Sequence, residues 1–473
     1  MKNRNESLDA LRGLSILAMV LSGSISFSAA LPVWMYHAQV PPPNHTFIPA
    51  IAGITWVDLV FPFFLFSMGA AIPLALNKLV QNNSSFLSVL WIAVRRFLLL
   101  AFFALFTEHM KAWVMAEQPL VKENILSIAA FVLLFFQLYQ NKNEQHKKLL
   151  MGLKIFSFAI AVLFLFFLRF NGEAFSFTKS DIIIILLANM AFFGAIIWWF
   201  TKNNKWLRIG ILPFVMAVFL ASNETGAGWA KDIFNFSHIG LFKFDWLYQF
   251  YFLKYLFIVV PGTIAGDYLL KNNNTNFLTA KIPTDKKYFT LIGLISFVLV
   301  MSNTIFLFTR QLAANLIFTI ALLATLFYWL NKMFTDKNHL LIKFFSAGAY
   351  LLLLGLFFEA YEGGIKKDHS TYSYYFVTSG LAFFMLIAFT SFAESKIGSV
   401  INNYLSLNGR NPMLAYVAGS LLLMPILQLT GLHIVFDSMN SNAWLGFLKG
   451  VLFTGIVSLV TVFCTKRGWF WKT

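Results

Sequence analysis

The chain has 473 residues, of which 59% are hydrophobic and only 12% are charged, and its mean hydropathy is +0.71. This charged share is about half that of an ordinary soluble domain, and it excludes a water-soluble fold of this size. The net charge of +16 would suit nucleic acid. However, the lysines and arginines lie in short connections rather than along a basic stripe, so we expect the lipid bilayer, and not nucleic acid, as the partner.

Apolar runs recur along the whole chain. About fourteen of them approach the 20 residues that a membrane-spanning helix needs. These runs are residues 8–31, 54–76, 97–113, 123–140, 150–169, 181–200, 207–222, 247–270, 289–309, 312–331, 343–360, 372–393, 411–431 and 444–465. The pattern predicts an all-α integral membrane protein, a polytopic bundle of about 12–14 transmembrane helices. We expect one membrane domain over residues 1–473, with 289–331 as an added helix hairpin.

Lysines and arginines gather in every second connection, and this alternation predicts the orientation of the chain. The rich connections hold, among others, Lys2, Arg4, Lys78, Arg95, Arg96, Lys202, Lys205, Arg208, Lys332, Lys337, Lys396, Arg410, Lys466 and Arg467. The connections between them hold far fewer. Because positive loops stay in the cytoplasm, we expect both termini to be cytoplasmic in a multi-pass protein of the inner membrane.

The segment Ser7-Leu-Asp-Ala-Leu-Arg-Gly13 opens the first span. Asp9 and Arg12 are three residues apart, so they share one helix face and can pair. The structural interpretation is a helix start, in which Ser7 caps the helix and Asp9 meets the positive end of its dipole. The functional interpretation is a cytoplasmic wall that binds an anionic cofactor. The structural interpretation is the more economical one.

Asp58 begins the second span, three residues after Thr55. This spacing is typical of a capping pair at a helix start. An acid beside a wholly apolar run is costly to insert into a membrane, however, and such acids are often functional. If His37 folds back over this helix end, Asp58 would hold its imidazole in one tautomer. The spacing alone does not choose between these roles.

Two histidines, His37 and His45, follow the first span. Either is a candidate base, although a lone loop histidine is more often a solvated side chain. Two histidines with a nearby acid could also bind a metal, but their spacing matches no zinc signature. Cys464 is the only cysteine, so a thiolate cluster and a disulfide framework are excluded. We expect no metal.

The connections opposite the basic side carry the more distinctive residues. One holds Trp34 beside the histidines, and another, residues 361–371, holds Lys366, Lys367 and His369. Loops on a helical scaffold are where function usually lies. On the basic side, Arg410 precedes a helix start, where it could bind phosphate or anchor the chain.

Several segments together resemble the heparan-alpha-glucosaminide N-acetyltransferase family, in its bacterial form. They are Ser7–Gly13, the His37-Ala38 pair, Asp58-Leu-Val-Phe-Pro62, Arg95-Arg96, Gly364–Phe384, Gly409-Arg-Asn411 with Tyr416, and Phe470-Trp-Lys472. The resemblance is discontinuous and strongest near the two ends of the chain. Ser22 stands where that family has an asparagine, and an insert, Gln39–Ala52, separates the His-Ala pair from Asp58.

The resemblance implies a membrane-bound acetyltransferase. Such an enzyme moves an acetyl group from cytoplasmic acetyl-CoA to the amine of a sugar or glycan, such as a glucosamine, on the periplasmic side. It implies His37 as the catalytic histidine, with His45 as the alternative, and Asp58 as its partner. Residues implied in binding the coenzyme are Arg12, Arg95, Arg96, Arg410 and Asn411, and those implied at the acceptor are Trp34, Lys366, Lys367 and His369. A homodimer is plausible for the family.

In this mechanism His37 either attacks the thioester or removes a proton from the acceptor. The coenzyme would bind at the basic face, and its acyl arm would reach across the membrane. Two other classes share the same composition. One is a multi-span transporter of a sugar or a lipid-linked envelope intermediate, and the other is a non-catalytic membrane scaffold.

Overall fold

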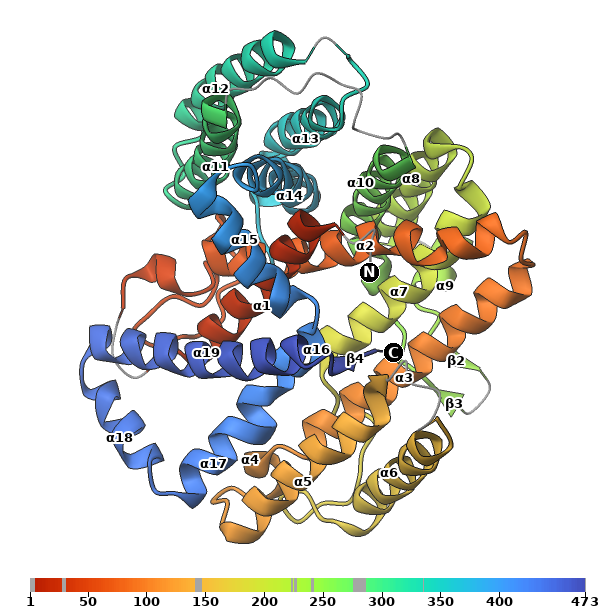
Figure 1. Cartoon of the computed structure of the whole chain (residues 1–473), viewed down its shortest axis with the longest axis vertical. Coiled ribbons are helices and arrows are strands. Elements are labelled where there is room, and N and C mark those ends of the chain that lie inside the picture. The colour runs from red at the N-terminus through yellow and green to blue at the C-terminus, as the bar shows by residue number, and fades with distance from the viewer. Residues whose placement is uncertain are drawn as a thin grey trace. The chain divides into compact units, whose positions relative to one another are not determined.

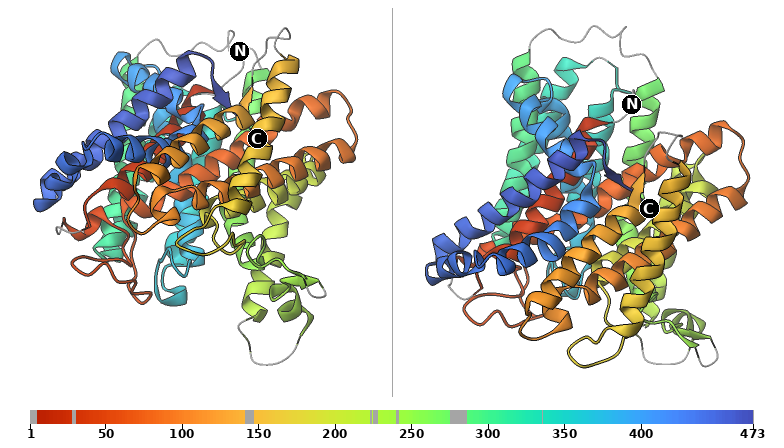
Figure 2. Two further views of the ribbon diagram at one scale, coloured as in Figure 1. Left: turned by 90° about the horizontal axis from the view of Figure 1, so that it is seen from below. Right: turned by 60° about the horizontal axis from the view of Figure 1, so that its bottom comes forward.

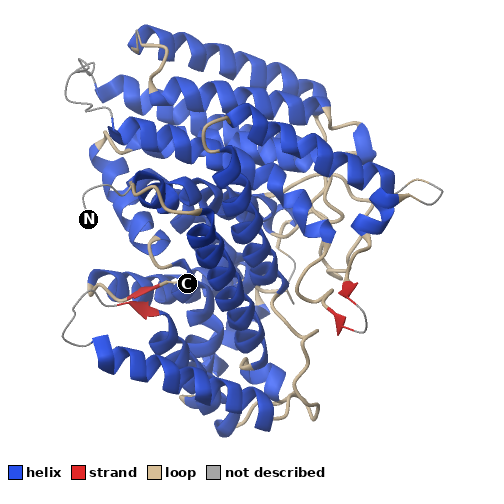
Figure 3. Cartoon of the chain, turned by 90° about the vertical axis from the view of Figure 1, so that its right-hand side faces the viewer, coloured by secondary structure: helices blue, strands red, loops and turns tan. Residues whose placement is uncertain are grey.

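The computed structural model describes residues 5–27, 31–140, 147–222, 224, 228–239, 242–274, 286–334 and 336–472. Lys2, Arg4 and positions 28–30 of the first predicted span lie outside these residues. Within them, nearly all regular structure is helical, and the strands form two short antiparallel ribbons, β1 with β4 and β2 with β3 (Figure 3). The prediction of an all-α protein is confirmed.

Thirteen helices in the described part of the chain are long and apolar enough to cross a membrane. This number lies within the predicted range and makes the chain a multi-pass membrane protein. The predicted first span is shorter than expected: its helix ends at Ser24, and it is not among the thirteen. Its first two turns hold three charged residues, Glu6, Asp9 and Arg12.

The chain forms two compact units, each described here by itself. Unit 1 comprises Met1–Asn77, Phe257–Pro412 and Asn440–Leu452. Its elements are α1 (Glu6–Ser24), η1 (Val33–Met35), most of α2 (Trp56–Gln81) and α10 (Leu256–Asn274), α11 (Lys286–Phe308), α12 (Leu312–Met333), α13 (Leu340–Phe357), η5 (Tyr361–Gly363), α14 (Tyr372–Phe392), α15 (Lys396–Gly409), η7 (Met439–Ser441) and the start of α19 (Ala443–Lys466). Helices α11, α13 and α14 pack together, and α15 lies against α1 (Figure 1).

Unit 2 comprises Lys78–Leu256, Met413–Met439 and Phe453–Thr473. Its elements are α3 (Phe86–His109), α4 (Ala112–Met115), α5 (Val121–Leu138), β1 (Tyr139–Gln140), α6 (Lys147–Phe167), α7 (Ile182–Thr201), α8 (Lys205–Ser222), α9 (Trp229–Phe234), β2 (His238–Ile239), β3 (Phe242–Lys243), η3 (Phe250–Tyr255), α16 (Pro412–Val417), η6 (Ala418–Leu423), α17 (Met424–Leu429), α18 (His433–Ser438) and β4 (Phe470–Trp471). Helix α3 packs on α7, and α9 lies at one end of α8 (Figure 2).

Helix α14 is the core of unit 1, since 89% of its apolar window is buried. Two of its hydroxyl groups bond carbonyls that prolines leave unpaired. Pro62 has no N–H to offer the Asp58 carbonyl four residues earlier, and the Tyr374 hydroxyl donates to that oxygen at 2.7 Å. The same relation joins Pro261 to the Phe257 carbonyl, to which the Ser379 hydroxyl donates at 3.1 Å. Helix α14 therefore fixes α2 and α10 at their proline positions.

Glycines allow two helix pairs in unit 1 to approach closely. A Cβ on Gly262 of α10 would lie 2.4 Å from the Phe66 backbone oxygen of α2, and one on Gly266 would lie 2.3 Å from that of Ala70. Gly409 of α15 packs on α1 in the same way, since a Cβ there would lie 1.8 Å from the Asp9 backbone oxygen. Close backbone contact through small residues is the usual way that membrane helices associate. Gly262 and Gly266 therefore serve the packing of α10 on α2.

Three local expectations are wrong. Asn5, and not Ser7, caps α1: its side chain accepts from the Leu8 N–H at 2.8 Å. Helix α3 starts at Phe86 rather than near 97. The span expected over 411–431 is present as Pro412–Leu429, with a π-helical turn, Ala418–Leu423, between α16 and α17. The connection before Arg410 is itself a helix, α15, whose polar residues conceal it from a search for apolar runs.

Candidate active site

The start of α2 holds a fully buried acid. Asp58 has an exposed side-chain fraction of 0%. Its Oδ2 accepts hydrogen bonds from two backbone N–H groups, that of Thr55 at 2.9 Å and that of Ala38 at 3.2 Å. The bond from Thr55 is the capping contact that the sequence predicts. Two main-chain donors fix the carboxylate in one orientation and leave Oδ1 for another partner.

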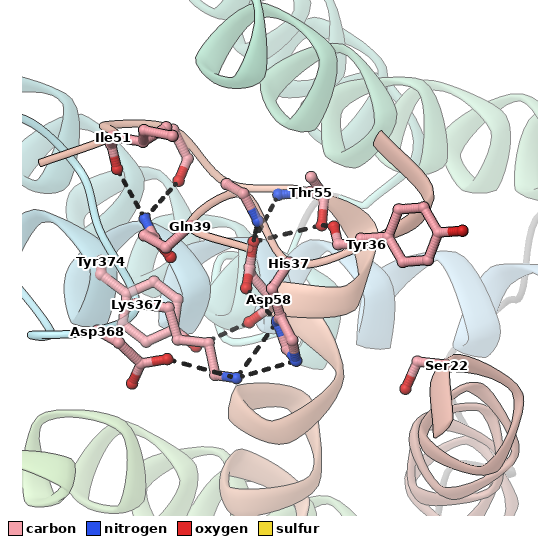
Figure 4. A network of polar contacts seen from close by, with 12 residues as sticks. Ser22, Tyr36, His37, Gln39, Ile51, Thr55, Asp58, Lys367, Asp368 and Tyr374 are labelled. Carbon is pink, nitrogen blue, oxygen red and sulfur yellow. Dashed lines mark hydrogen bonds and ion pairs between the residues drawn. The ribbon is translucent and has the colours of Figure 1, made fainter. Parts of the chain in front are cut away.

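That partner is the imidazole of His37. Its Nδ1 lies 2.6 Å from Asp58 Oδ1 (Figure 4). Because Ala38 donates to the other oxygen of the same carboxylate, the His-Ala pair grips Asp58 with a side chain and a backbone N–H. The ring is 36% exposed, so one partner is buried and the other faces outward. An ionised carboxylate accepts, so Nδ1 carries the proton and Nε2 carries the lone pair.

The loop that carries His37 is held at several points. The Thr55 hydroxyl donates to the Tyr36 carbonyl at 2.7 Å, and the Tyr36 hydroxyl donates to the Ser26 carbonyl at 2.7 Å. Burial raises the pKa of Tyr36, so its hydroxyl stays a donor. The Gln39 amide donates to the Ile51 carbonyl at 2.9 Å. The loop between α1 and α2 therefore presents His37 on a fixed backbone.

Lys367, from the connection between α13 and α14, completes the group. Its Nζ lies 3.3 Å from Nδ1 and 3.3 Å from Nε2 of His37. The Asp368 carboxylate is 3.9 Å from the same Nζ. The Lys367 side chain is only 19% exposed, so its charge acts in a partly dehydrated place. The three side chains, Asp58, His37 and Lys367, are here called the His37 group.

The backbone around Lys367 is also held in place. The Ile365 N–H donates to Glu359 Oε1 at 3.1 Å, and Arg310 forms an ion pair with that same oxygen. The Gly53 N–H donates to the Ile365 carbonyl at 2.7 Å, which ties this connection to the residues just before α2. The Arg310 turn of the α11–α12 hairpin thus supports the connection between α13 and α14, which carries Lys367.

The other histidine lies elsewhere in the same loop. The His45 ring packs edge-on against Tyr36, with centroids 4.5 Å apart, and against Phe27 at 5.0 Å. Among the described residues, neither of its ring nitrogens has a hydrogen-bond partner. The geometry therefore pairs Asp58 with His37 and not with His45.

The remaining predicted acceptor residues are only partly gathered here. Trp34 is 48% exposed. The exposed ring of His369 lies edge-on to Phe47 at 6.4 Å. Lys366 is half-buried, and its backbone N–H bonds the Thr371 hydroxyl at 3.1 Å. Ser22 stands outside the hydrogen-bonded group, since its hydroxyl donates to the Met19 carbonyl at 2.9 Å (Figure 4).

The basic residues predicted to bind a coenzyme fall into two sets. In unit 1, Arg12 pairs with Asp9 at 3.3 Å and donates to the Ser67 carbonyl at 3.1 Å and the Gly409 carbonyl at 3.4 Å. Arg410 lies 3.8 Å from the other Asp9 oxygen. The predicted Asp9–Arg12 pair is confirmed, and these contacts give Arg12 a role in joining three helices.

The other members of the coenzyme set are more scattered. Asn411 is fully buried beside Arg410. Arg95 is exposed and Arg96 half-buried on α3, in unit 2. The described residues include no group of three His, Cys, Asp or Glu side chains that could hold a metal ion.

The bond from Tyr374 to α2 escaped the sequence prediction. Part of its signal was present, because a proline four residues after Asp58 frees a carbonyl that needs a donor. The donor itself lies 316 positions away, and no local pattern identifies it.

These features define a multi-pass helical membrane protein with a buried acid that orients a partly exposed histidine. A family model described as "Domain of unknown function (DUF5009)" matches residues 4–269, which is more than half of the chain. The chain belongs to this family. The match includes His37 and Asp58 and ends before Lys367. No curated protein matches the chain.

Proposed function

We propose that this protein is a membrane-bound acyltransferase. It would move an acetyl group from cytoplasmic acetyl-CoA to an amino sugar or glycan on the periplasmic side of the inner membrane. The observation that carries the proposal is the contact of 2.6 Å between His37 Nδ1 and the fully buried Asp58 carboxylate. A buried acid that orients an exposed imidazole is the arrangement that acyl transfer uses to activate a nucleophile or a base.

Asp58 has two tasks in this mechanism. It keeps the proton of His37 on Nδ1, so that Nε2 presents its lone pair to the substrate. It also stabilises the positive charge that the ring gains. In one route, Nε2 attacks the thioester carbonyl and the coenzyme leaves as a thiolate; the amine then attacks the acetylated ring, the Nε2–acyl bond breaks, and the freed Nε2 takes the proton that the amine loses. In the other route, Nε2 removes the proton of the amine as the amine attacks the thioester directly.

The donor would bind from the cytoplasmic side, on which we place both termini. In unit 1, Arg410 with Asn411 is the proposed contact of the coenzyme phosphates, since a guanidinium group binds two phosphate oxygens at once. Arg95 and Arg96, which belong to unit 2, stay predictions from the family resemblance. Arg12 belongs to the predicted coenzyme set as well. Its guanidinium already donates to two backbone carbonyls, so we propose that it holds the helices around the coenzyme rather than binding the phosphates.

The acceptor would bind among the exposed and half-buried side chains that share loops with the His37 group. Trp34 offers an aromatic face on which a sugar ring can stack. Lys366 and His369 offer donors to its hydroxyl groups. The cofactor requirement is then acetyl-CoA alone, without a metal.

The test uses wild-type protein and His37→Ala in proteoliposomes with radiolabelled acetyl-CoA and a panel of amino sugars. We expect transfer of label to an amino sugar by wild type and its loss in His37→Ala, with both proteins equally folded by thermal unfolding. Label flux without acetylation would support the transporter instead. If neither acetyl transfer nor flux of label is detected, the non-catalytic scaffold is the remaining interpretation.

A further inference from the structure

We propose that Lys367 is the group that polarises the reacting carbonyl. The inference rests on the proposed acyl transfer and adds a catalytic role to a residue first placed among the acceptor contacts. Both routes of that reaction pass through a tetrahedral intermediate with a negative oxygen. Enzymes stabilise such an oxygen with donors that are already in place.

The position of the ammonium group supports this role. Lys367 Nζ is equally far, 3.3 Å, from both ring nitrogens of His37. If Nζ lay in the plane of the ring at this distance from both nitrogens, it would overlap either Cε1, the carbon between them, or the carbons on the opposite side of the ring. The ammonium therefore lies over the face of the imidazole. It does not block the Nε2 lone pair, which points outward in the plane.

This placement suits the tetrahedral intermediate. When Nε2 bonds to the carbonyl carbon, the π electrons of the carbonyl move to its oxygen. That oxygen can turn toward the ring face, where an ammonium about 3 Å away donates to it. On collapse, the oxygen reforms its double bond and the thiolate leaves with the other electron pair. Lys367 keeps its proton throughout, so its charge is unchanged.

The surroundings keep the ammonium in this position and strengthen its effect. The Lys367 side chain is 19% exposed and that of its nearest acid, Asp368, is 50% exposed at 3.9 Å. A charge that is poorly hydrated and only loosely paired interacts more strongly with a developing anion than one in water. Glu359 fixes the nearby backbone through the Ile365 N–H at 3.1 Å, so the lysine is positioned before the substrate arrives.

The first experiment measures the reactivity of His37 without any substrate. Diethyl pyrocarbonate acylates an imidazole through a tetrahedral oxyanion, whereas iodoacetamide alkylates it without one. Mass spectrometry follows both rates at His37 in wild type, Lys367→Met, Lys367→Arg and the control Lys449→Met. Lys449 is a half-buried lysine of the same unit, whose Nζ donates to Asn440 at 3.1 Å. The exposed His238 is the internal reference.

We expect Lys367→Met to lower the acylation rate at His37 at least tenfold relative to the alkylation rate. Lys367→Arg should restore part of it, and Lys449→Met should change neither. If both rates change together, Lys367 only orients or protonates the ring. If acylation of His37 becomes faster in Lys367→Met, Lys367 merely shields the ring from the reagent. Either result overturns the inference.

The second experiment is acetyl transfer itself. Lys367→Met should lower kcat by about 10²-fold, with a small change in KM, as for the loss of one oxyanion donor. A loss confined to KM would return Lys367 to acceptor binding. If wild type transfers no acetyl group while the reagent experiment succeeds, the proposed function fails but the role of Lys367 toward carbonyl groups stands.

Discussion

Replacing Asp58 with asparagine should abolish transfer while the fold survives. Oδ2 of Asp58 accepts from the backbone N–H groups of Thr55 and Ala38. In Asp58→Asn, the amide oxygen must occupy the position of Oδ2, because an NH₂ group there would face two N–H donors and could accept from neither. The NH₂ group then faces His37 Nδ1, which becomes an acceptor. The ring proton moves to Nε2, the nitrogen that the reaction needs without one.

The magnitude follows from this wrong tautomer. Loss of the correct tautomer in a histidine–acid pair costs about 10³–10⁴-fold in kcat, which is about 4–5.5 kcal/mol of barrier. The stability should change less, by about 1 kcal/mol, because both backbone hydrogen bonds remain with a neutral acceptor. Asp58→Ala should be worse for folding, since it leaves two buried N–H groups unpaired at about 1–3 kcal/mol each.

The assay compares kcat and the thermal unfolding midpoint for wild type, Asp58→Asn and Asp181→Asn. Asp181 is a matched control in unit 2, because its buried side chain caps α7 through the Ile183 and Ile184 N–H groups at 3.1 and 3.2 Å. We expect Asp181→Asn to keep transfer per folded molecule. An Asp58→Asn protein within tenfold of wild type, or one that loses activity only in proportion to unfolding, would refute the tautomer argument.

Four further outcomes test the fold and the site. Gly262→Ala should cost about 1–3 kcal/mol of stability, since its Cβ would lie 2.4 Å from a backbone oxygen, whereas Gly152→Ala, with nothing within 4 Å, should not; thermal unfolding in detergent compares them. Tyr374→Phe leaves a buried carbonyl unpaired and should cost about 1–3 kcal/mol in the same assay. His45→Ala should retain acetyl transfer within a few-fold, because Asp58 contacts the other histidine. Burial lowers the pKa of His339 from 6.5 to about 4, so the unfolded chain binds more protons between these values. Stability should therefore fall as the pH drops through that window, and His339→Asn should flatten the dependence of the unfolding midpoint on pH.

The helices could be predicted from the sequence because insertion into lipid demands a local property, a run of about 20 apolar residues. Prediction from apolar runs fails for a helix that is not surrounded by lipid on all sides. Helix α15 is amphipathic and packs on α1, so no apolar run marks it. Helix α1 starts among charged side chains that pair with one another at Asp9 and Arg12, and a hydropathy window places its end too late.

The His37 group divides in the same way. The contact between His37 and Asp58 joins residues only 21 positions apart, across one loop, and the residue types suggested it. Lys367 lies 330 positions from His37, and a sequence shows only that a lysine stands in a loop on the expected side. What brings it to the ring is tertiary: the Arg310–Glu359 ion pair, the Gly53–Ile365 hydrogen bond and the docking of α14 on the carbonyl that Pro62 leaves unpaired. Pro62 removes one backbone hydrogen bond from α2 at Asp58. The Tyr374 hydroxyl, which replaces that bond, belongs to α14, the helix that follows Lys367. The Tyr374 hydroxyl therefore joins the start of α2, which carries Asp58, to the helix that follows Lys367, so a substitution at Tyr374 should disturb the His37–Asp58 pair and the lysine together rather than either alone.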